Sequence, residues 1–223
     1  TRGKTRSRNL HDIGSHNERG EPQRRGKRKD FHRYDGDRSR NGTCVRLIVE
    51  FVRICSPDEP EYGEAMKLYK VSFPEHEQRT GAAQRVVMGK ESYNFDLICE
   101  DGSFVGDILY WESEDFIYVE HFCIVSVLRG KGLGKRALEL LGRSGKTVIL
   151  GIDPPRDSVS ERRRDFYLRA GYRMNSIEHI HPPYRKEYDG HRLKVMSFPR
   201  ELSETEYENF ASFLRNTVMK DLP

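Results

Sequence analysis

Hydrophobic and polar residues alternate in short runs along most of this chain, and a few longer stretches repeat apolar residues at helical spacing. We expect strands at residues 45–54, 95–99, 104–110, 116–125, 146–152, 172–175 and 192–198. Helical spacing marks residues 62–69, 133–141 and 162–170, and the last of these stops at Gly171. This order predicts an α+β fold, with a mixed, mostly antiparallel sheet flanked by helices and one parallel step.

The C-terminal segment carries the signature of one more helix. Ser203 and Glu206 have the spacing of a capping box. Apolar residues then recur on one helical face at Tyr207, Phe210, Leu214 and Val218. The simplest interpretation is a helix packed on the domain, and a homodimer contact is the weaker alternative.

Charge is distributed unevenly between the first 43 residues and the rest of the chain. Residues 1–43 hold 13 Lys/Arg against 6 Asp/Glu, whereas the remainder holds 26 against 29. The first segment has too few large apolar residues to offset the entropy of ordering it. We therefore expect a disordered basic tail or extension at 1–43 and one domain at 44–223. The tail could contact nucleic acid or an acidic partner, or could simply be solvated.

The most informative motif is a glycine-rich turn between the strand at 116–125 and the helix that follows. It reads Arg129-Gly130-Lys131-Gly132-Leu133-Gly134-Lys135. Alternating glycines let successive backbone N–H groups point into one small space, and the N-terminus of the helix adds partial positive charge there. This geometry binds a phosphate or pyrophosphate. The spacing matches neither a P-loop nor a Rossmann fingerprint, and a glycine-rich connection with solvated basic residues is the structural alternative.

Other sequence features restrict the environment and the cofactors that we expect. No apolar run approaches the roughly 18 residues that a membrane helix needs, and no secretory signal is visible. The four cysteines, Cys44, Cys55, Cys99 and Cys123, form no C-x-x-C pair. We therefore expect reduced thiols, no metal site, no membrane association and a cytoplasmic location.

A second motif, together with the first, indicates a family. The segment Asp165-Phe166-Tyr167-Leu168-Arg169-Ala170-Gly171-Tyr172 lies about one strand beyond the glycine turn. Both motifs, in this order, resemble those of the GNAT N-acetyltransferase superfamily, over roughly residues 45–220 and not over the basic tail. The resemblance implies acetyl-CoA as cosubstrate and direct transfer of its acetyl group to the amine of an acceptor, either a small molecule or a protein.

The resemblance also implies where the cofactor would lie. In this fold the central strand splays away from its neighbour, and pantetheine pairs in the gap with main-chain groups. Here Cys123, Ile124 and Val125 occupy those positions. The pyrophosphate would be held by the glycine turn, which comprises Arg129, Gly130, Lys131, Gly132, Leu133, Gly134 and Lys135. Relatives often carry an Asn before the second motif, and this chain has none there.

Two catalytic roles follow from the chemistry of amine acylation. An amine is protonated at neutral pH, so a general base is useful, and the first candidate is Glu120. His121 should face the opposite side of its strand, unless a bulge changes the alternation. Tyr167 matches the tyrosine that serves as general acid for the leaving thiolate in many members, although a core aromatic is the structural alternative.

The acceptor side is less clearly marked in the sequence. Glu75 and Glu77 could bind or deprotonate the amine, and Tyr184 could contact the acceptor. His179 and His181 lack a third metal ligand at a telling spacing. Because Pro182-Pro183 follow them, we expect them in a loop before a strand, and the resemblance implies that this loop borders the acceptor. Three alternatives remain open at this stage: transfer of another acyl group, a coenzyme A-binding regulatory domain without turnover, and an RNA-associated protein that binds through its tail.

Overall fold

A single eight-stranded sheet organises the protein. The computed structural model describes residues 34–36, 47–220 and 222. The strands are β1 (Tyr34–Gly36), β2 (Leu47–Ile54), β3 (Tyr93–Glu100), β4 (Ser103–Glu112), β5 (Phe116–Ile124), β6 (Thr147–Ile152), β7 (Arg173–His181) and β8 (His191–Phe198). Their order is β1-β2-β3-β4-β5-β6-β8-β7. All neighbouring strands are antiparallel except β5 and β6, which confirms the predicted fold class and its single parallel step.

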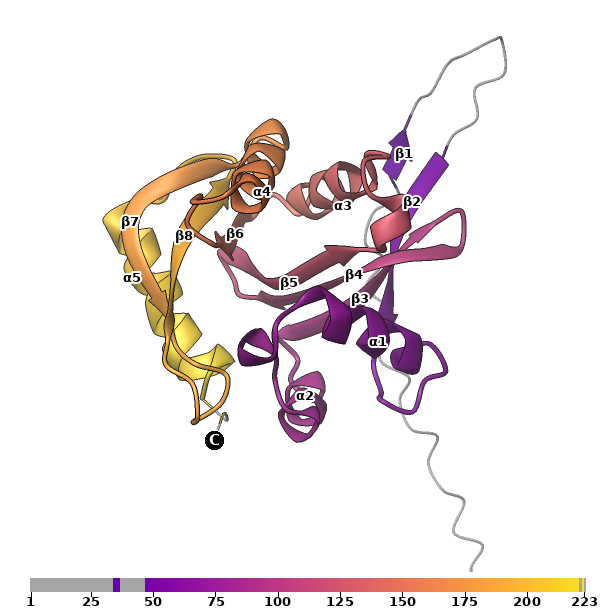
Figure 1. The fold of residues 1–223 in the computed structure, drawn as a ribbon, viewed down its shortest axis with the longest axis horizontal. Coiled ribbons are helices and arrows are strands. Elements are labelled where there is room, and N and C mark those ends of the chain that lie inside the picture. The colour runs from indigo at the N-terminus through magenta and orange to yellow at the C-terminus, as the bar shows by residue number, and fades with distance from the viewer. Residues whose placement is uncertain (1–33, 37–46, 221, 223) are drawn as a thin grey trace, which may run out of the picture.

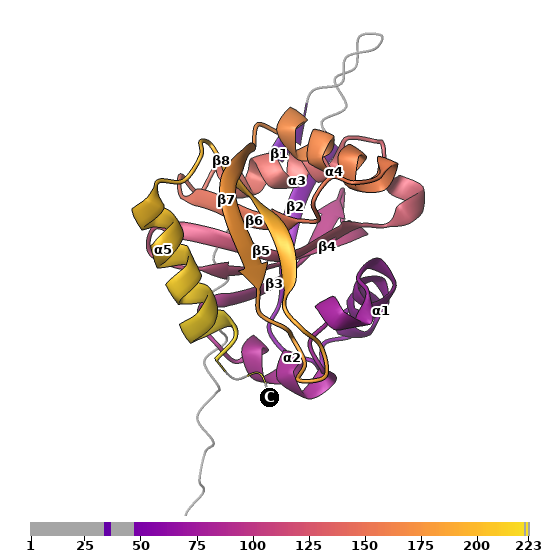
Figure 2. The same ribbon diagram turned by 60° about the vertical axis from the view of Figure 1, so that its left-hand side comes forward.

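Helices cover both faces of this sheet. They are α1 (Tyr62–Ser72), α2 (Gly81–Met88), α3 (Leu133–Gly142), α4 (Ser158–Arg169) and α5 (Glu204–Phe213), with short 3-10 turns at Glu75–Glu77 and Ser126–Leu128 and a π-helical turn at Leu214–Val218. Figure 1 shows α3 and α4 above the sheet and α1 and α2 below it. In Figure 2, α5 runs beside β7 and β8.

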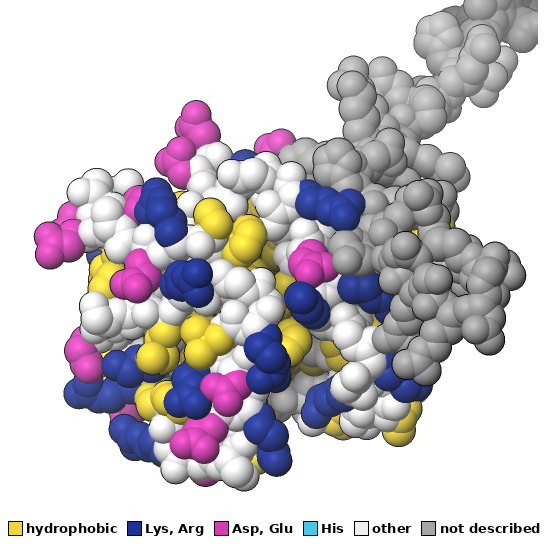
Figure 3. Space-filling view, turned by 90° about the horizontal axis from the view of Figure 1, so that it is seen from above, with side chains coloured by type: hydrophobic (Ala, Val, Ile, Leu, Met, Phe, Trp, Pro, Cys, Tyr) yellow, Lys and Arg dark blue, Asp and Glu magenta, His cyan; other side chains and the backbone are white. Residues whose placement is uncertain are grey.

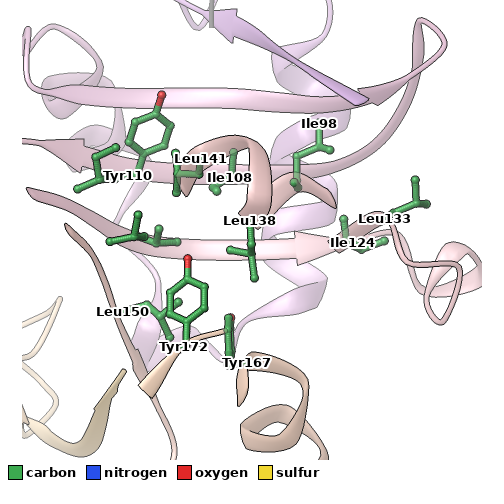
Figure 4. Close-up of a cluster of buried hydrophobic side chains, with 14 of the residues drawn as sticks. Ile98, Ile108, Tyr110, Ile124, Leu133, Leu138, Leu141, Leu150, Tyr167 and Tyr172 are labelled. Carbon is green, nitrogen blue, oxygen red and sulfur yellow. The ribbon is translucent and has the colours of Figure 1, made fainter. Parts of the chain in front are cut away.

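Each face of the sheet has its own apolar core. The core under α3 and α4 contains Leu133, Leu138 and Leu141 from α3, together with Tyr167 and Tyr172, and Figure 4 shows these side chains packed around β5. The opposite core joins Ala65 and Tyr69 of α1 to Phe210 of α5. The C-terminal helix thus packs on the domain, and the Ser203–Glu206 capping box begins it. Burying these apolar side chains on both faces fixes the sheet between its helices.

Strands β5 and β6 pair over only part of their length. Phe116–Val119 pair with Thr147–Leu150, whereas β5 continues to Ile124 and β6 to Ile152. The two strands therefore separate towards the glycine-rich turn that follows β5. This splay leaves main-chain groups of the second half of β5 without a partner strand on that side.

Four details differ from the sequence expectations. Helix α2 was not expected, and α4 begins at Ser158 because the Asp157 side chain caps its first turn. His179 and His181 lie in strand β7, not in a loop, since β7 pairs with β8 up to the His181–His191 pair. Strand β1 lies within the stretch that we expected to be disordered. The rest of residues 1–43, and Cys44, lie outside the described residues.

Candidate active site

The glycine-rich turn has the conformation that its sequence requires. Gly130 and Gly132 have φ angles of 79° and 80°, a region that L-residues with side chains rarely adopt. A Cβ atom on either residue would have no neighbour within 4 Å, so the space beside the turn is open. Gly132 is the N-cap of α3 and has no side chain to accept hydrogen bonds from the first turn. The N–H groups at the start of α3 therefore remain suited to an anion.

Basic side chains surround this turn. Arg129, Lys131 and Lys135 are all exposed. Figure 3 looks onto the face that carries α3 and α4, where many Lys and Arg side chains lie around apolar ones. These charges can neutralise phosphate groups that the backbone N–H groups bind only in part.

The main chain of β5 near the splay is partly engaged by the protein itself. Arg129 Nε donates to the Ile124 carbonyl oxygen at 3.0 Å, and the Val125 N–H donates to the Val105 carbonyl oxygen at 3.0 Å. Cys123 pairs with Asp107 of β4. Two of the three residues predicted to contact pantetheine thus already use a main-chain group within the protein, Ile124 its carbonyl oxygen and Val125 its N–H. That prediction remains open for the groups that are left.

Gly134 explains how closely α3 approaches α4. A Cβ atom at this position would lie 3.2 Å from the Phe166 ring and 3.4 Å from the Phe122 ring. Without that atom, the first turn of α3 can lie against the helix that carries Tyr167. The third glycine of the turn therefore serves helix packing, whereas Gly130 and Gly132 serve the backbone turn.

Tyr167 lies on the inner side of α4. Its ring packs 5.7 Å from Tyr172, and Figure 4 shows both side chains beside β5. Burial raises the pKa of Tyr167 to about 12, and the thiol of Cys123 contributes in the same direction. The hydroxyl therefore keeps its proton at neutral pH and can donate it in a hydrogen bond.

A β-bulge in β5 decides how Glu120 and His121 are oriented. In the β4–β5 pairing, Leu109 is opposite His121 and the next residue, Tyr110, is opposite Val119, so Glu120 has no partner. The extra residue breaks the alternation of side chains along the strand. As a result, both Glu120 and His121 contact the segment between α1 and α2. The expectation that His121 faces the opposite side holds only without this bulge, and the structure contains it.

The Glu120 carboxylate is enclosed by two fixed donors. Arg79 Nη2 donates to one oxygen at 2.6 Å and the Trp111 indole N–H donates to the other at 2.8 Å, and the Glu120 side chain is 0% exposed. Burial alone would raise the pKa of Glu120, but Arg79, His121 and the Trp111 hydrogen bond hold it below its ordinary value. A carboxylate held in this way accepts a proton poorly. The lowered pKa makes Glu120 a weak base, and its two fixed donors suit it to hold neighbouring segments in place.

Arg79, which the sequence analysis did not single out, is the centre of this network. The same guanidinium also donates to the Val218 carbonyl oxygen at 3.0 Å and lies over the Trp111 and Tyr184 rings at 5.6 and 5.4 Å. Its only sequence signal was its place in the polar cluster after Phe73-Pro74. Since its partner lies 41 residues away, no local pattern could have revealed the pair.

His121 is the second buried polar group of the bulge. Its Nε2 lies 2.8 Å from the Glu77 carbonyl oxygen, which requires a proton on that nitrogen. The other ring nitrogen, Nδ1, is buried and has no partner in the described part of the chain. Burial lowers the pKa of His121, so the ring is neutral near pH 7.

The three predicted acceptor residues occupy different environments. Tyr184 is buried beside His121 and stacks on His181 at 4.9 Å. Glu77 is half-buried, and burial together with the charge of Asp153 raises its pKa. Glu75, in contrast, is largely exposed and forms an ion pair with Arg185 at 2.5 Å. Glu77 and Tyr184 therefore lie beside the β-bulge of β5, whereas the Glu75 side chain lies on the surface.

The described residues give no support for a metal site or for a membrane-spanning helix. They include no group of three His, Cys, Asp or Glu side chains arranged to hold a metal ion. No helix within the same ranges is long and apolar enough to span a membrane.

Comparison with known sequences gives one curated relative. No protein-family model matches this chain. The protein named "Putative acetyltransferase YjbC" from Bacillus subtilis (strain 168) is 26% identical over 115 residues, which cover 47% of this chain. The matched part spans 58% of the length of that relative.

Solved structures extend the likeness to most of the described chain. One of them is "Putative acetyltransferase from GNAT family" from Bacteroides thetaiotaomicron. It has a TM-score of 0.72 and 29% identity, and the match covers 76% of this chain and 98% of that protein. Naa50 of Arabidopsis thaliana and an aminoglycoside 6'-N-acetyltransferase share the fold at a TM-score of 0.50, with 14% and 16% identity, each covering 69% of this chain and 99% of its own.

The combination of the splayed β5–β6 pair, the glycine turn that begins α3 and the tyrosine of α4 defines the class of protein. In these features and in its match to the two acetyltransferases described above, this chain is similar to the GNAT acetyltransferase superfamily. Among the proteins named above, the Bacteroides thetaiotaomicron protein matches the greatest share of this chain, 76%.

Proposed function

We propose that this protein is an acetyl-CoA-dependent N-acetyltransferase that transfers the acetyl group directly to the primary amine of an acceptor. The observation that carries the proposal is that the end of the β5–β6 pairing, the glycine turn with open space beside it and Tyr167 lie together, since Ile124, Leu133 and Tyr167 share one apolar core. Two of the solved relatives were crystallised with a coenzyme A-based bisubstrate analogue or with coenzyme A.

The chemistry of the described residues fits this cosubstrate. The turn offers backbone N–H groups, open space at Gly130 and Gly132 and three exposed cations, which suit a pyrophosphate. Bound acetyl-CoA would supply the activated acyl group. Tyr167, whose hydroxyl stays protonated at neutral pH, would then give a hydrogen bond or a proton to the departing thiolate.

Glu77 is the better candidate for the group that handles the amine proton. Its carboxylate is half-buried and its pKa is raised, which brings a carboxylate closer to the range that suits a general base. Its main-chain oxygen meanwhile fixes His121 at the bulge. Glu120 and Arg79 would hold that segment in place without touching the reacting atoms.

The proposal is tested by calorimetric titration of acetyl-CoA into the protein and into Gly132→Glu. We expect micromolar binding by the parent protein and a loss of at least about 100-fold in the variant, because a carboxylate would occupy the anion site. Gly102→Glu is the matched control, since Gly102 also has a positive φ and open space but lies in the β3–β4 hairpin. Absence of binding by the folded parent protein would refute the proposal.

Turnover separates an enzyme from a coenzyme A-binding regulatory domain. Thiol release from acetyl-CoA in the presence of a panel of amines should depend on both the amine and Tyr167. Binding without any amine-dependent thiol release would instead favour the regulatory alternative.

A further inference from the structure

An open pocket of about 490 Å³ lies between the end of β6, the start of α4 and the start of β8. Its volume is in the range of small-molecule sites. Three arginines line it, Arg156, Arg163 and Arg192, against two carboxylates, Asp153 and Asp157. No role proposed above uses this pocket.

The two carboxylates of the pocket are already committed to the protein. Asp157 accepts hydrogen bonds from the Val159 and Ser160 N–H groups at 2.8 and 2.9 Å, and these bonds lower its pKa. Asp153 forms an ion pair with Arg163 at 2.6 Å. With three arginines against two carboxylates the lining carries a net charge of +1, and Arg156 and Arg192 are the arginines that Asp153 does not pair with.

Arg192 can exchange its present partner for a ligand. It contacts Glu178 of the neighbouring strand at 2.7 Å, and both side chains are mostly exposed, at 64% and 74%. Exposed pairs of this kind contribute little free energy, so an anionic group of a ligand can compete with Glu178. Arg156, at the entrance to α4, lies on the same pocket wall as the first turn of that helix.

The pocket adjoins the groups proposed for acetyl transfer. The ring of His191, the neighbour of Arg192, lies 5.9 Å from the ring of His76, the neighbour of Glu77, and Arg163 and Tyr167 are one turn apart on α4. The pocket follows β6, whereas the glycine turn with its own cations follows β5. A ligand that fills the pocket would therefore reach towards Glu77 and Tyr167 from the strand on the other side of the splay.

We propose that this pocket binds an anionic oxygen group, a carboxylate or a phosphate, that the acceptor carries in addition to its reactive amine. Arg156 and Arg192 would bind the anionic group, while Glu77 receives the amine. The inference rests on the proposed acetyltransferase function and narrows its acceptor class to amines that also bear a negative group.

The test uses pairs of amines that differ in one group. L-Lysine and 1,5-diaminopentane differ by a carboxylate, and phosphoethanolamine and ethanolamine differ by a phosphate. Binding of each is measured by calorimetry to the full chain saturated with coenzyme A, so that turnover is not needed. We expect the anionic member of at least one pair to bind about tenfold or more tightly than its partner, and the pair that responds identifies the group.

Substitutions assign the preference to the pocket. In Arg156→Gln/Arg192→Gln the difference within the pair should fall to about twofold or less, with the Kd of acetyl-CoA unchanged. Arg162→Gln is the matched control, because Arg162 is an exposed residue of α4 that does not line the pocket. Thermal unfolding of each variant verifies that it is folded.

Three outcomes would overturn the inference. The anionic members could bind no better than their partners, the preference could survive the double substitution, or that substitution could weaken acetyl-CoA instead, which would make the pocket part of the cofactor site. Failure of the proposed function has a different signature, because the parent protein would then not bind acetyl-CoA at all.

Discussion

The two sides of the β5–β6 splay differ in the groups that form them, main-chain N–H groups on one side and buried side chains on the other. On the side of α3, the proposed anion site consists of main-chain N–H groups within one turn, and the basic side chains of that turn are exposed. On the side of α1 and α2, the site is made from buried side chains, with Arg79, Glu120 and His121 joined across separate elements. The first side should therefore tolerate side-chain changes, whereas the second should respond to single substitutions in stability as well as in activity.

The largest effect is expected from Arg79→Met. This change leaves the Glu120 carboxylate buried without its ion-pair partner, which costs about 3–5 kcal/mol. Urea unfolding measures the loss, and Arg85→Met, at an exposed position of the following helix α2, is the control. If Arg79→Met unfolds like its control, the Arg79–Glu120 pair does not support the acceptor side as we describe.

Tyr167→Phe should affect the rate and spare the fold. Loss of the proton donor should lower kcat by about 100-fold, or ~2.7 kcal/mol, with the Kd of acetyl-CoA nearly unchanged. Tyr172→Phe is the matched control, because its hydroxyl is buried without a partner in the described part of the chain. Equal kcat values for the two variants would remove the catalytic role of Tyr167.

Acid should weaken the acceptor side selectively. Burial lowers the pKa of His179 to about 4 and that of His181 to about 3, so both are neutral in the folded protein at pH values where the unfolded chain protonates them. Their stabilising contribution is present above the unfolded pKa of roughly 6.5 and is lost as pH falls below it, by about 2 kcal/mol for each histidine at pH 5.

Urea unfolding at pH 7 and pH 5 measures this effect, and His181→Gln should reduce the difference between the two values. Amide exchange at pH 5 should accelerate in β7 and β8 more than in α3. A pH dependence that is unchanged in His181→Gln would show that other groups cause it.

The smallest expected effect is the difference in acceptor kinetics between substitutions of Glu77 and Glu75. Glu77→Gln should lower kcat and raise the KM for the acceptor, together by about tenfold or more in kcat/KM, because it removes the half-buried carboxylate proposed to take the amine proton. Glu75→Gln should change that KM less than about twofold, since its ion pair with Arg185 is exposed on the glutamate side. Steady-state kinetics on both variants compares them, and equal values would place Glu75 in the site as well.

The contrast between the two sides also determines how much could be predicted from the sequence. The glycine turn with its helix and the Tyr167 motif are each contiguous in sequence. The order of the elements predicted the fold class, and the resemblance of the two motifs to those of GNAT proteins implied the proposed cofactor residues. The C-terminal capping box was equally local and is confirmed.

The arrangement of residues on the acceptor side could not be predicted from local sequence patterns, because it depends on contacts between distant segments. Glu120 had the position expected of a base, but its carboxylate is paired with Arg79, which reaches it from another element. The bulge that turns Glu120 and His121 to one side is a property of the β4–β5 register and not of either residue. His179 and His181 were expected in a loop because Pro182 and Pro183 follow them, yet pairing with β8 extends the strand.

The hydrogen bond between Trp111 and Glu120 has a practical consequence for spectroscopy. Trp111 is the one tryptophan of the chain, its side chain is fully buried, and the Arg79 guanidinium lies 5.6 Å from its ring. Intrinsic fluorescence excited at the indole thus comes from a single position, in contact with the bulge. Its emission wavelength and lifetime give a label-free signal for events on the acceptor side, while ligands that bind only at the glycine turn should leave that signal almost unaltered.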